Sequence, residues 1–433
     1  MSPFFRWLRS LIEPGIVAGL LLATGGCVTG PATQPPSTTA SEEQVYREFY
    51  PTYAEICAVS QLGKNHGFGA EISSGIGGHA VLYLNGVCRR QDTDYPVLMM
   101  CDEEKDPSDG VGLSVNEHYK GAEWVAIEGR EFFFNGGLKP GEPLTKDAYR
   151  ATQAAAQAKG IYTSVSFHKR FYDDMAPGFT PESYKYEISV ATDYAITFGR
   201  NRYCARVPVD RAQMQTIVTY LNDQNAPYRN GEPFDWNLFE HKCAHLNHNA
   251  LAAADLWDQW PTDRFILISL FDFPVPKNEF VNLMRRTNDV PIDDLAALYQ
   301  DDAARRLLLE HGRLPTQPGA LMDLGSIPRE NEVYDPHSDI IFYDEPLTGS
   351  YEEHFEAILG SPRYYRLEDN LAYFAGLYDK IKANRRPVEA YLANRTPEDQ
   401  AAFRTFYAAY FEYIDRESRE VGRNLARLKS QTL

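Results

Sequence analysis

Between about residues 43 and 273, runs of apolar residues alternate with polar stretches in a pattern that mixes strands and helices. The strand-like runs are rich in β-branched and aromatic residues, which favour extended backbone. They are Val81–Val87, Val97–Met100, Trp124–Phe134, Ser164–Phe167, Tyr184–Thr197 and Tyr203–Val207. Because the runs are short and close together, an antiparallel sheet is the arrangement that we expect.

Helical segments separate these runs. Thr145 to Lys159 is rich in alanine and is closed by Gly160, and Asp210 with Gln213 resembles a capping box that opens a second helix. A third segment begins at Cys243 and continues through an Ala/Leu-rich stretch to Ala254. Helices that are segregated from an antiparallel sheet predict the α+β fold class.

After Pro274 the pattern becomes mostly helical. Apolar residues recur every three or four positions in two long stretches, which is typical of amphipathic helices. They are Leu367, Leu371, Phe374, Leu377 and Ile381, followed by Phe403, Tyr407, Tyr410, Ile414, Val421, Leu425 and Leu428. Thr396 and Pro397 are suited to the N-cap and first position of the last helix. We expect a sheet-containing domain at 44–275 and a helical accessory domain at 276–433.

The first 27 residues resemble a bacterial lipoprotein signal peptide. Arg6 and Arg9 precede an apolar stretch that is too short to span a bilayer, and small residues lead to Cys27, the residue that would carry the lipid. An uncleaved anchor helix is the alternative. Residues 28–43, rich in Pro, Thr and Ser, are typical of a flexible tether. The resemblance, with Val28 after the lipidated cysteine, implies an outer-membrane anchor and a domain that faces the periplasm.

The composition limits the possible partners. The net charge is −17, so the chain repels nucleic acid and anionic lipid head groups at long range. We therefore expect no nucleic-acid partner, and contact with the membrane through the N-terminal anchor rather than through surface charge. With 27 Tyr and 23 Phe, the chain has ample material for a packed core.

Cysteine pairing can be narrowed from the sequence. Once Cys27 is set aside, Cys57, Cys88, Cys101, Cys204 and Cys243 remain, an odd number, so at least one cannot pair within the chain. If Cys243 is that residue, Cys88 with Cys101 is the more plausible disulfide, and Cys57 with Cys204 follows by elimination. Two unpaired structural thiols are equally compatible with the sequence.

His79 and Cys243 are the candidate catalytic pair. His79 follows two glycines at the start of an apolar run, and Cys243 begins a helix. Positive charge and unpaired N–H groups at a helix N-terminus favour a thiolate and can stabilise an oxyanion. A buried structural cysteine would have a similar sequence context.

These two segments resemble a known superfamily. The aromatic-rich approach Phe234–Phe239 before Cys243 is similar to papain-like enzymes of the NlpC type, and the order His before Cys matches their circularly permuted members. The Gly78-His79 strand and the segment from Tyr203 to Ala254 most resemble the Lnb N-terminal periplasmic domain family. This resemblance covers roughly residues 60 to 260. It implies a permuted papain-like fold and a thiol acyltransferase or hydrolase that acts on phospholipid or lipoprotein acyl groups through a thioester.

A third residue should orient the imidazole of His79. The resemblance places a polar side chain on the strand after the His strand, and Glu128 ends such a run. His118 and Asn116 are the competitors, and an ordinary strand-end carboxylate is the alternative for Glu128. Lys242 stands where the family often has Asn, and its charge could lower the pKa of the thiol.

Other kinds of function remain open. His241, His245 and His248 would share one helical face with the spacing of metal ligands, although an exposed polar face would look the same. A papain-like groove that only binds, or a peptidoglycan amidase or endopeptidase, is also compatible with the sequence. The thiol mechanism requires no cofactor and no metal.

Overall fold

The centre of the protein is a six-stranded antiparallel sheet. The structure is a computed structural model that describes residues 25–28, 40–65, 78–102, 110–173, 175, 177–237, 243–261, 275–336, 340–343, 350–393 and 395–431. In spatial order the strands are β7 (Val125–Glu128), β6 (Val111–Ser114), β3 (His79–Asn85), β2 (Tyr53–Val59), β8 (Arg202–Pro208) and β9 (Leu321–Gly325). The three central strands are β3, β2 and β8, whose side chains are buried on both faces of the sheet.

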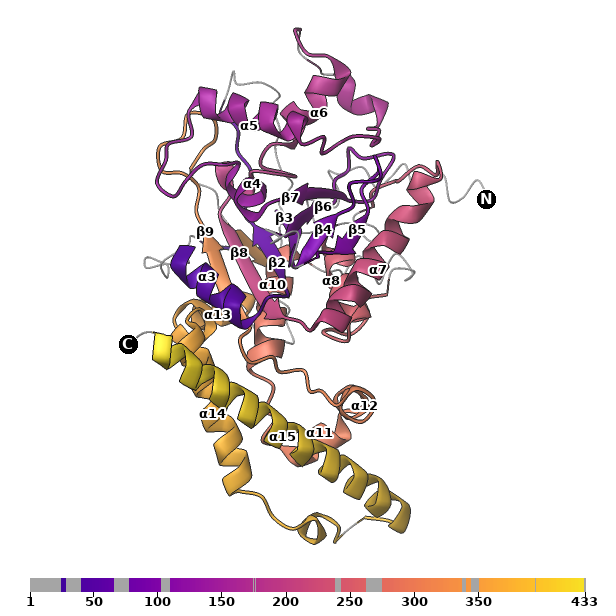
Figure 1. Cartoon of the computed structure of the whole chain (residues 1–433), viewed down its shortest axis with the longest axis vertical. Coiled ribbons are helices and arrows are strands. Elements are labelled where there is room, and N and C mark those ends of the chain that lie inside the picture. Colours follow the sequence, from indigo (N-terminus) through magenta and orange to yellow (C-terminus); the bar gives the residue numbers. More distant parts are fainter. Residues whose placement is uncertain are drawn as a thin grey trace.

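Helices surround this sheet and extend away from it (Figure 1). Those near the sheet are α3 (Ala40–Phe49), α4 (Arg130–Asn135), α5 (Lys146–Ala158), α6 (Pro181–Ser189), α7 (Arg211–Arg229), α8 (Cys243–Ala253), α10 (Pro276–Asn288) and α13 (Tyr351–Leu359). The others are α11 (Leu295–Gln300), α12 (Asp302–His311), α14 (Leu367–Ala383) and α15 (Pro397–Gln431). Short 3-10 turns are η1 (Lys169–Tyr172), η2 (Ile196–Phe198), η3 (Pro362–Tyr364) and η4 (Val388–Tyr391). The mixed α/β architecture with an antiparallel sheet agrees with the sequence prediction.

The C-terminal region is mostly helical, also as predicted. Helices α11, α12, α14 and α15 share a second hydrophobic core, separate from that of the sheet. Thr396 caps α15, where its hydroxyl accepts a hydrogen bond from the backbone N–H of Asp399 at 3.3 Å. In Figure 1, α14 and α15 form the long lower arm of the molecule. None of the helices that the structure describes is long and apolar enough to cross a bilayer.

The sheet itself uses residues from both sides of the boundary expected at 275. β9 pairs with β8 through the register Cys204 to Asp323, and α10 packs against β2 and β8. A short strand such as β9 has no sequence signal beyond a few apolar residues, and its place is decided by the partner strand.

Three predicted strands are wrong in whole or in part. The run 124–134 is a strand only to Glu128, because Gly129 has a positive φ of 92° and α4 follows it. The run 184–197 begins as helix α6, whose capping box at Thr180 and first-turn proline determine the backbone more strongly than the aromatic residues. The run 164–167 contributes only an isolated bridge between Phe167 and Tyr119.

Both disulfides named from the sequence are present. Cys57 on β2 is joined to Cys204 directly opposite on β8, and Cys88 on β4 (Val87–Arg89) is joined to Cys101 beyond β5 (Leu98–Met100). β4 and β5 form a separate two-stranded sheet. Among the residues that the structure describes, Cys243 is the cysteine of this region that forms no disulfide.

A short strand near the N-terminus pairs with a distant part of the chain. The backbone of β1 (Gly25–Val28) pairs with β10 (Ile340–Tyr343), which places Cys27 opposite Ile341. The remainder of the expected signal peptide lies outside the described residues. α3 begins at Ala40, so the expected tether at 28–43 ends in a helix whose Glu43 pairs with Arg206 in a buried ion network.

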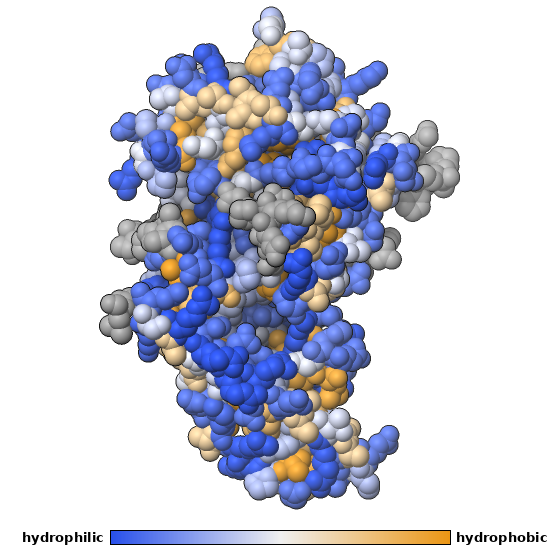
Figure 2. Space-filling model, viewed as in Figure 1, coloured by the Kyte–Doolittle hydropathy of each residue, from blue (hydrophilic) through white to orange (hydrophobic). Residues whose placement is uncertain are grey.

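The visible surface is mainly hydrophilic (Figure 2). Hydrophobic residues appear there as small separate patches, one of them in the region of α5. This surface is consistent with the net charge of −17.

Candidate active site

His79 is the first residue of β3, at the end of this strand where a glycine lets the backbone pack closely against its neighbours. The preceding Gly78 has a φ of +67°. A Cβ at this position would lie 2.5 Å from the carbonyl oxygen of Val59 and 2.8 Å from the Nζ atom of Lys277. A glycine is therefore required before His79. Its missing side chain leaves the space in which the Nζ atom of Lys277 lies, next to the start of β3.

The His79 ring is oriented by a serine that leads to a buried carboxylate. Its Nε2 atom lies 3.2 Å from Oγ of Ser114, the last residue of β6. Ser114 in turn donates to Oδ1 of Asp193 at 2.9 Å, with the Thr192 carbonyl at 3.1 Å as a weaker alternative acceptor. Since Ser114 has one hydrogen, its oxygen accepts from the Nε2–H of His79. Nδ1 is then the unprotonated nitrogen, the one that can accept a proton.

Asp193 collects hydrogen bonds from several elements. Its Oδ1 accepts from Ser114 and from Asn116 Nδ2 at 2.8 Å, and its Oδ2 accepts from the Tyr162 hydroxyl at 2.9 Å and from His118 Nε2 at 3.1 Å. Burial alone would raise the pKa of Asp193, but the charge and hydrogen bonds of His118 and the other donors hold it well below its ordinary value. Asp193 is therefore an anion at neutral pH, and it orients His79 through Ser114.

His79 is uncharged at neutral pH. Burial and the nearby positive charge of Arg200 lower the pKa of His79 to about 3, although Asp193 acts in the opposite direction. A neutral imidazole can accept the proton of a thiol. Because the imidazolium that results is disfavoured in this environment, the transfer requires a further group that stabilises the thiolate.

Cys243 is the first residue of α8, and α8 packs against β3, the strand that begins at His79. Cys243 is buried, with 7 % of the residue exposed. Its position in the first turn gives it the environment that favours a thiolate. The structure thus places the two sequence-predicted residues on elements that pack against each other.

Arg200 is a buried cation that lies within electrostatic range of both His79 and Cys243. It lies two positions before β8, at the end of the sheet where Val59 pairs with both His79 and Arg202. Its guanidinium interacts electrostatically with His79 and with Cys243. Burial lowers the pKa of Arg200 to about 10, which still leaves it fully charged at pH 7. A fixed cation here stabilises a thiolate of Cys243.

Glu128, the third residue proposed from the sequence, is not brought to His79. It lies at the other end of the sheet, where it pairs with Val111, which in turn pairs with Leu84. Its carboxylate accepts a hydrogen bond from Gln91 at 2.9 Å. The competitors His118 and Asn116 do join the site, through Asp193 rather than by direct contact with His79.

Sequence reasoning missed Ser114, Asp193 and Arg200. The signal for Asp193 was its position as the one charged residue in the buried run from Ile188 to Phe198, where a carboxylate needs partners. Because the sequence analysis predicted a strand for this run, the signal for a buried Asp193 was overlooked. Ser114 gave no signal of its own, since small polar residues commonly end strands.

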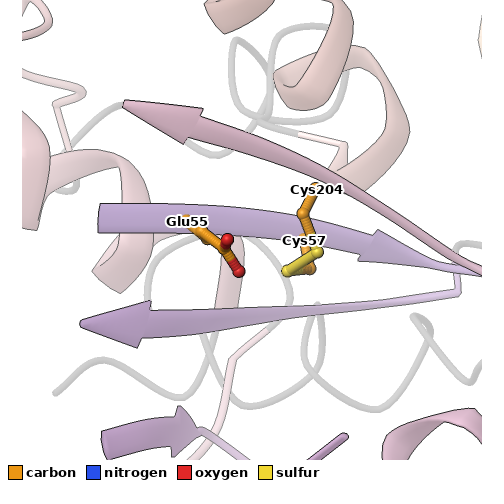
Figure 3. A group of neighbouring side chains, drawn as sticks. All are labelled: Glu55, Cys57 and Cys204. Carbon is orange, nitrogen blue, oxygen red and sulfur yellow. A yellow bond between two sulfur atoms is a disulfide. The ribbon is translucent and has the colours of Figure 1, made fainter. Parts of the chain in front are cut away.

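Of the histidine face proposed for a metal, the structure describes His245 and His248, and both are buried. His241 and Lys242 lie outside the described residues. Both ring nitrogens of His248 have protein partners, the Glu279 carboxylate at 2.5 Å and the Asp258 carbonyl at 2.8 Å. Within the described residues, the group with metal-ligand spacing is Glu55, Cys57 and Cys204, whose two sulfur atoms are joined to each other (Figure 3).

We expect that dialysis against EDTA leaves the activity unchanged, because the bases and charges around Cys243 belong to the protein itself. Elemental analysis of the dialysed protein would accompany the assay. Loss of activity that is restored by one equivalent of zinc per chain would contradict the thiol assignment and favour the histidine face.

A cavity of about 820 Å³ lies away from this site. Its lining is polar and includes Arg90, Lys120, Ser164 and Arg229, from the region between β4 and the end of α7. Neither Cys243 nor His79 contributes to it. Its position therefore gives no information on the substrate of the thiol.

Comparison with other proteins adds no relative: no family model matches the chain, no curated protein matches it, and no solved structure matches it.

Proposed function

We propose that this protein is a thiol-dependent acyltransferase or hydrolase in which Cys243 is the nucleophile and His79 the base. The observation that carries the proposal is the chain from His79 through Ser114 to Asp193, which orients a neutral imidazole on the strand against which the Cys243 helix packs. A buried structural cysteine would not require an oriented histidine, a buried carboxylate and a buried guanidinium around it.

The reaction proceeds in two steps. Nδ1 of His79 accepts the thiol proton, and the charge of Arg200 stabilises the Cys243 thiolate. The thiolate attacks an ester or amide carbonyl, backbone N–H groups of the first turn of α8 stabilise the oxyanion, and the leaving alcohol or amine departs with the proton from His79. Water or an amine then attacks the thioester, again with His79 as the base, and restores the thiol.

The fold and the location belong to the same proposal. The antiparallel sheet, the His-bearing strand and the Cys-led helix occur in the order of circularly permuted papain-like proteins, and the Lnb-type resemblance favours phospholipid or lipoprotein acyl groups over peptide bonds of peptidoglycan. A lipid on Cys27 would anchor the domain to the outer membrane, facing the periplasm.

The proposal is tested by trapping the thioester. The mature protein would be incubated with envelope phospholipid and, in parallel, with muropeptides, and the tryptic peptide of Cys243 analysed by mass spectrometry. We expect a mass increase that corresponds to a fatty acyl group, removable by neutral hydroxylamine. A peptidoglycan-derived adduct would assign the protein to the amidases instead, and no adduct with either substrate would contradict the enzyme proposal.

His79→Asn should lower the rate of Cys243 alkylation at pH 7 by about tenfold, because without the imidazole the thiol returns toward its ordinary pKa of about 8.5. The measurement is the rate of iodoacetamide labelling as a function of pH. His168→Asn is the matched control, since this half-buried histidine bonds the Phe234 carbonyl rather than any group of the site. Equal pH profiles for the parent and His79→Asn would refute the pairing.

A further inference from the structure

Two buried cations beside the candidate thiol have unsatisfied donors. Arg200 is 2 % exposed and Lys277 is 0 % exposed. Within the part of the chain that the structure describes, Nε and Nη1 of Arg200 and Nζ of Lys277 have no hydrogen-bond partner. Buried charged groups without partners are strongly unfavourable, so a fold that retains two of them together indicates a binding role.

The two cations lie at the same end of the sheet. Lys277 is the second residue of α10, which packs against β2, β8 and α8, and its Nζ lies against Gly78, the residue before His79. Arg200 lies two residues before β8. Burial and repulsion from Arg200 lower the pKa of Lys277 to about 7, so each cation lies within the electrostatic range of the other.

The anionic group nearby is Asp193, which acts on Arg200 at a distance but makes no hydrogen bond to it. Asp193 already accepts hydrogen bonds from four side chains, and burial raises the pKa of Tyr334, which leaves that phenol neutral. A Cys243 thiolate would add a second negative charge, yet within the described residues the free donors of Arg200 and Lys277 have no acceptor. The site therefore has room for a ligand that offers acceptor oxygens to both cations.

We propose that Arg200 and Lys277 bind the phosphate of a glycerophospholipid acyl donor while Cys243 attacks its ester carbonyl. The inference rests on the proposed acyl chemistry of Cys243. A guanidinium binds phosphate oxygens through two parallel N–H donors and an ammonium binds them as a point charge, so a phosphodiester would supply the acceptor oxygens that these donors lack. In a glycerophospholipid the phosphate and the ester carbonyls are carried by one three-carbon backbone, so one molecule can contact both groups.

The activity test compares an acyl donor that carries a phosphodiester head group with one that has a hydroxyl in its place. Short-chain diheptanoyl phosphatidylglycerol and diheptanoylglycerol carry the same esters, and both are used as monomers. Lys277→Met should raise KM for the phospholipid about tenfold and leave the rate with diheptanoylglycerol unchanged. Arg285→Gln, an exposed position on the same helix, should change neither. An equal loss with both donors, or a preference for carboxylate-bearing muropeptides, would overturn the inference.

A stability measurement separates a binding role from a structural one. If Lys277 is retained for a ligand, Lys277→Met removes an uncompensated buried charge and should raise the melting temperature by about 2 °C in the absence of lipid. A lower melting temperature would mean that the ammonium has a stabilising partner within the protein, and the inference would then be wrong.

The binding step can be measured without turnover. Calorimetric titration of Cys243→Ala with diheptanoyl phosphatidylglycerol should show binding that the double variant Cys243→Ala/Lys277→Met loses. If this binding is found while no variant transfers an acyl group, the phosphate site stands and the proposed function fails. If acyl transfer is found with equal efficiency for both donors and no Lys277-dependent binding occurs, the proposed function stands and the phosphate site fails.

Discussion

Cys243→Ala should abolish acyl transfer, with a fall in rate of at least about 10⁴-fold, because no other group in the site can form the thioester. The fold should be preserved. The exchange removes one sulfur atom from a helix that already contains several alanines, and a cavity of that size costs about 1 kcal/mol. The measurement is turnover of the phospholipid donor, with circular dichroism and the melting temperature measured on the same preparations.

Cys243→Ser is the matched variant, since it keeps an oxygen nucleophile in place of the sulfur. Because a hydroxyl ionises far less readily than a thiol, we expect its activity to lie near that of the alanine variant. A variant Cys243→Ala that retains full turnover with an unchanged melting temperature would contradict the assignment of the nucleophile. It would leave the buried structural thiol as the better interpretation.

The sequence could predict the elements on which the candidate residues lie. The helix that begins at Cys243 and the strand at His79 were both predicted, because a helix start and a glycine-led strand have short-range signals. The two disulfides were one of the pairings that the odd cysteine count left open, and the capping residues Thr396 and Asp210 followed from side-chain chemistry alone.

The rest of the site depends on contacts between distant segments. Ser114 and Asp193 are separated by 79 residues, and their hydrogen bond requires the run after α6 to fold back toward β6. Ala191 and Ala195 adopt positive φ values of 62° and 52° on either side of Asp193, a conformation that no alanine-containing pattern predicts. Glu128 had the favourable strand position in the sequence, but the register of β6 with β7 sets it at the opposite end of the sheet.

The same geometry makes Asp193 the residue whose loss should be most damaging to both the fold and the base. Each of its oxygens accepts two hydrogen bonds, Oδ1 from Ser114 and Asn116 and Oδ2 from His118 and Tyr162. In Asp193→Asn the amide nitrogen must replace one of these oxygens, and it then faces two donors whichever way it is turned. We expect a loss of about 3 kcal/mol in the free energy of unfolding at pH 7. Asp235→Asn, at an exposed carboxylate, should change it little.

The pH dependence distinguishes loss of the charge from general damage. The pKa of Asp193 is lowered from its ordinary value of 3.8 in the folded state, so its charge stabilises the fold fully above about pH 4, and this contribution declines as the pH falls below that value. Urea unfolding at pH 7 and at pH 3 should therefore show a smaller difference between the parent and Asp193→Asn at the lower pH. The effect of His79 on the alkylation of Cys243 should also weaken in this variant. Ser114 then has no anionic acceptor, and the imidazole ring of His79 loses its fixed orientation. The assignment would be wrong if the difference in unfolding free energy were the same at both pH values and the iodoacetamide profile of Cys243 were unchanged. Asp193 would then neither carry the buried charge nor orient the base.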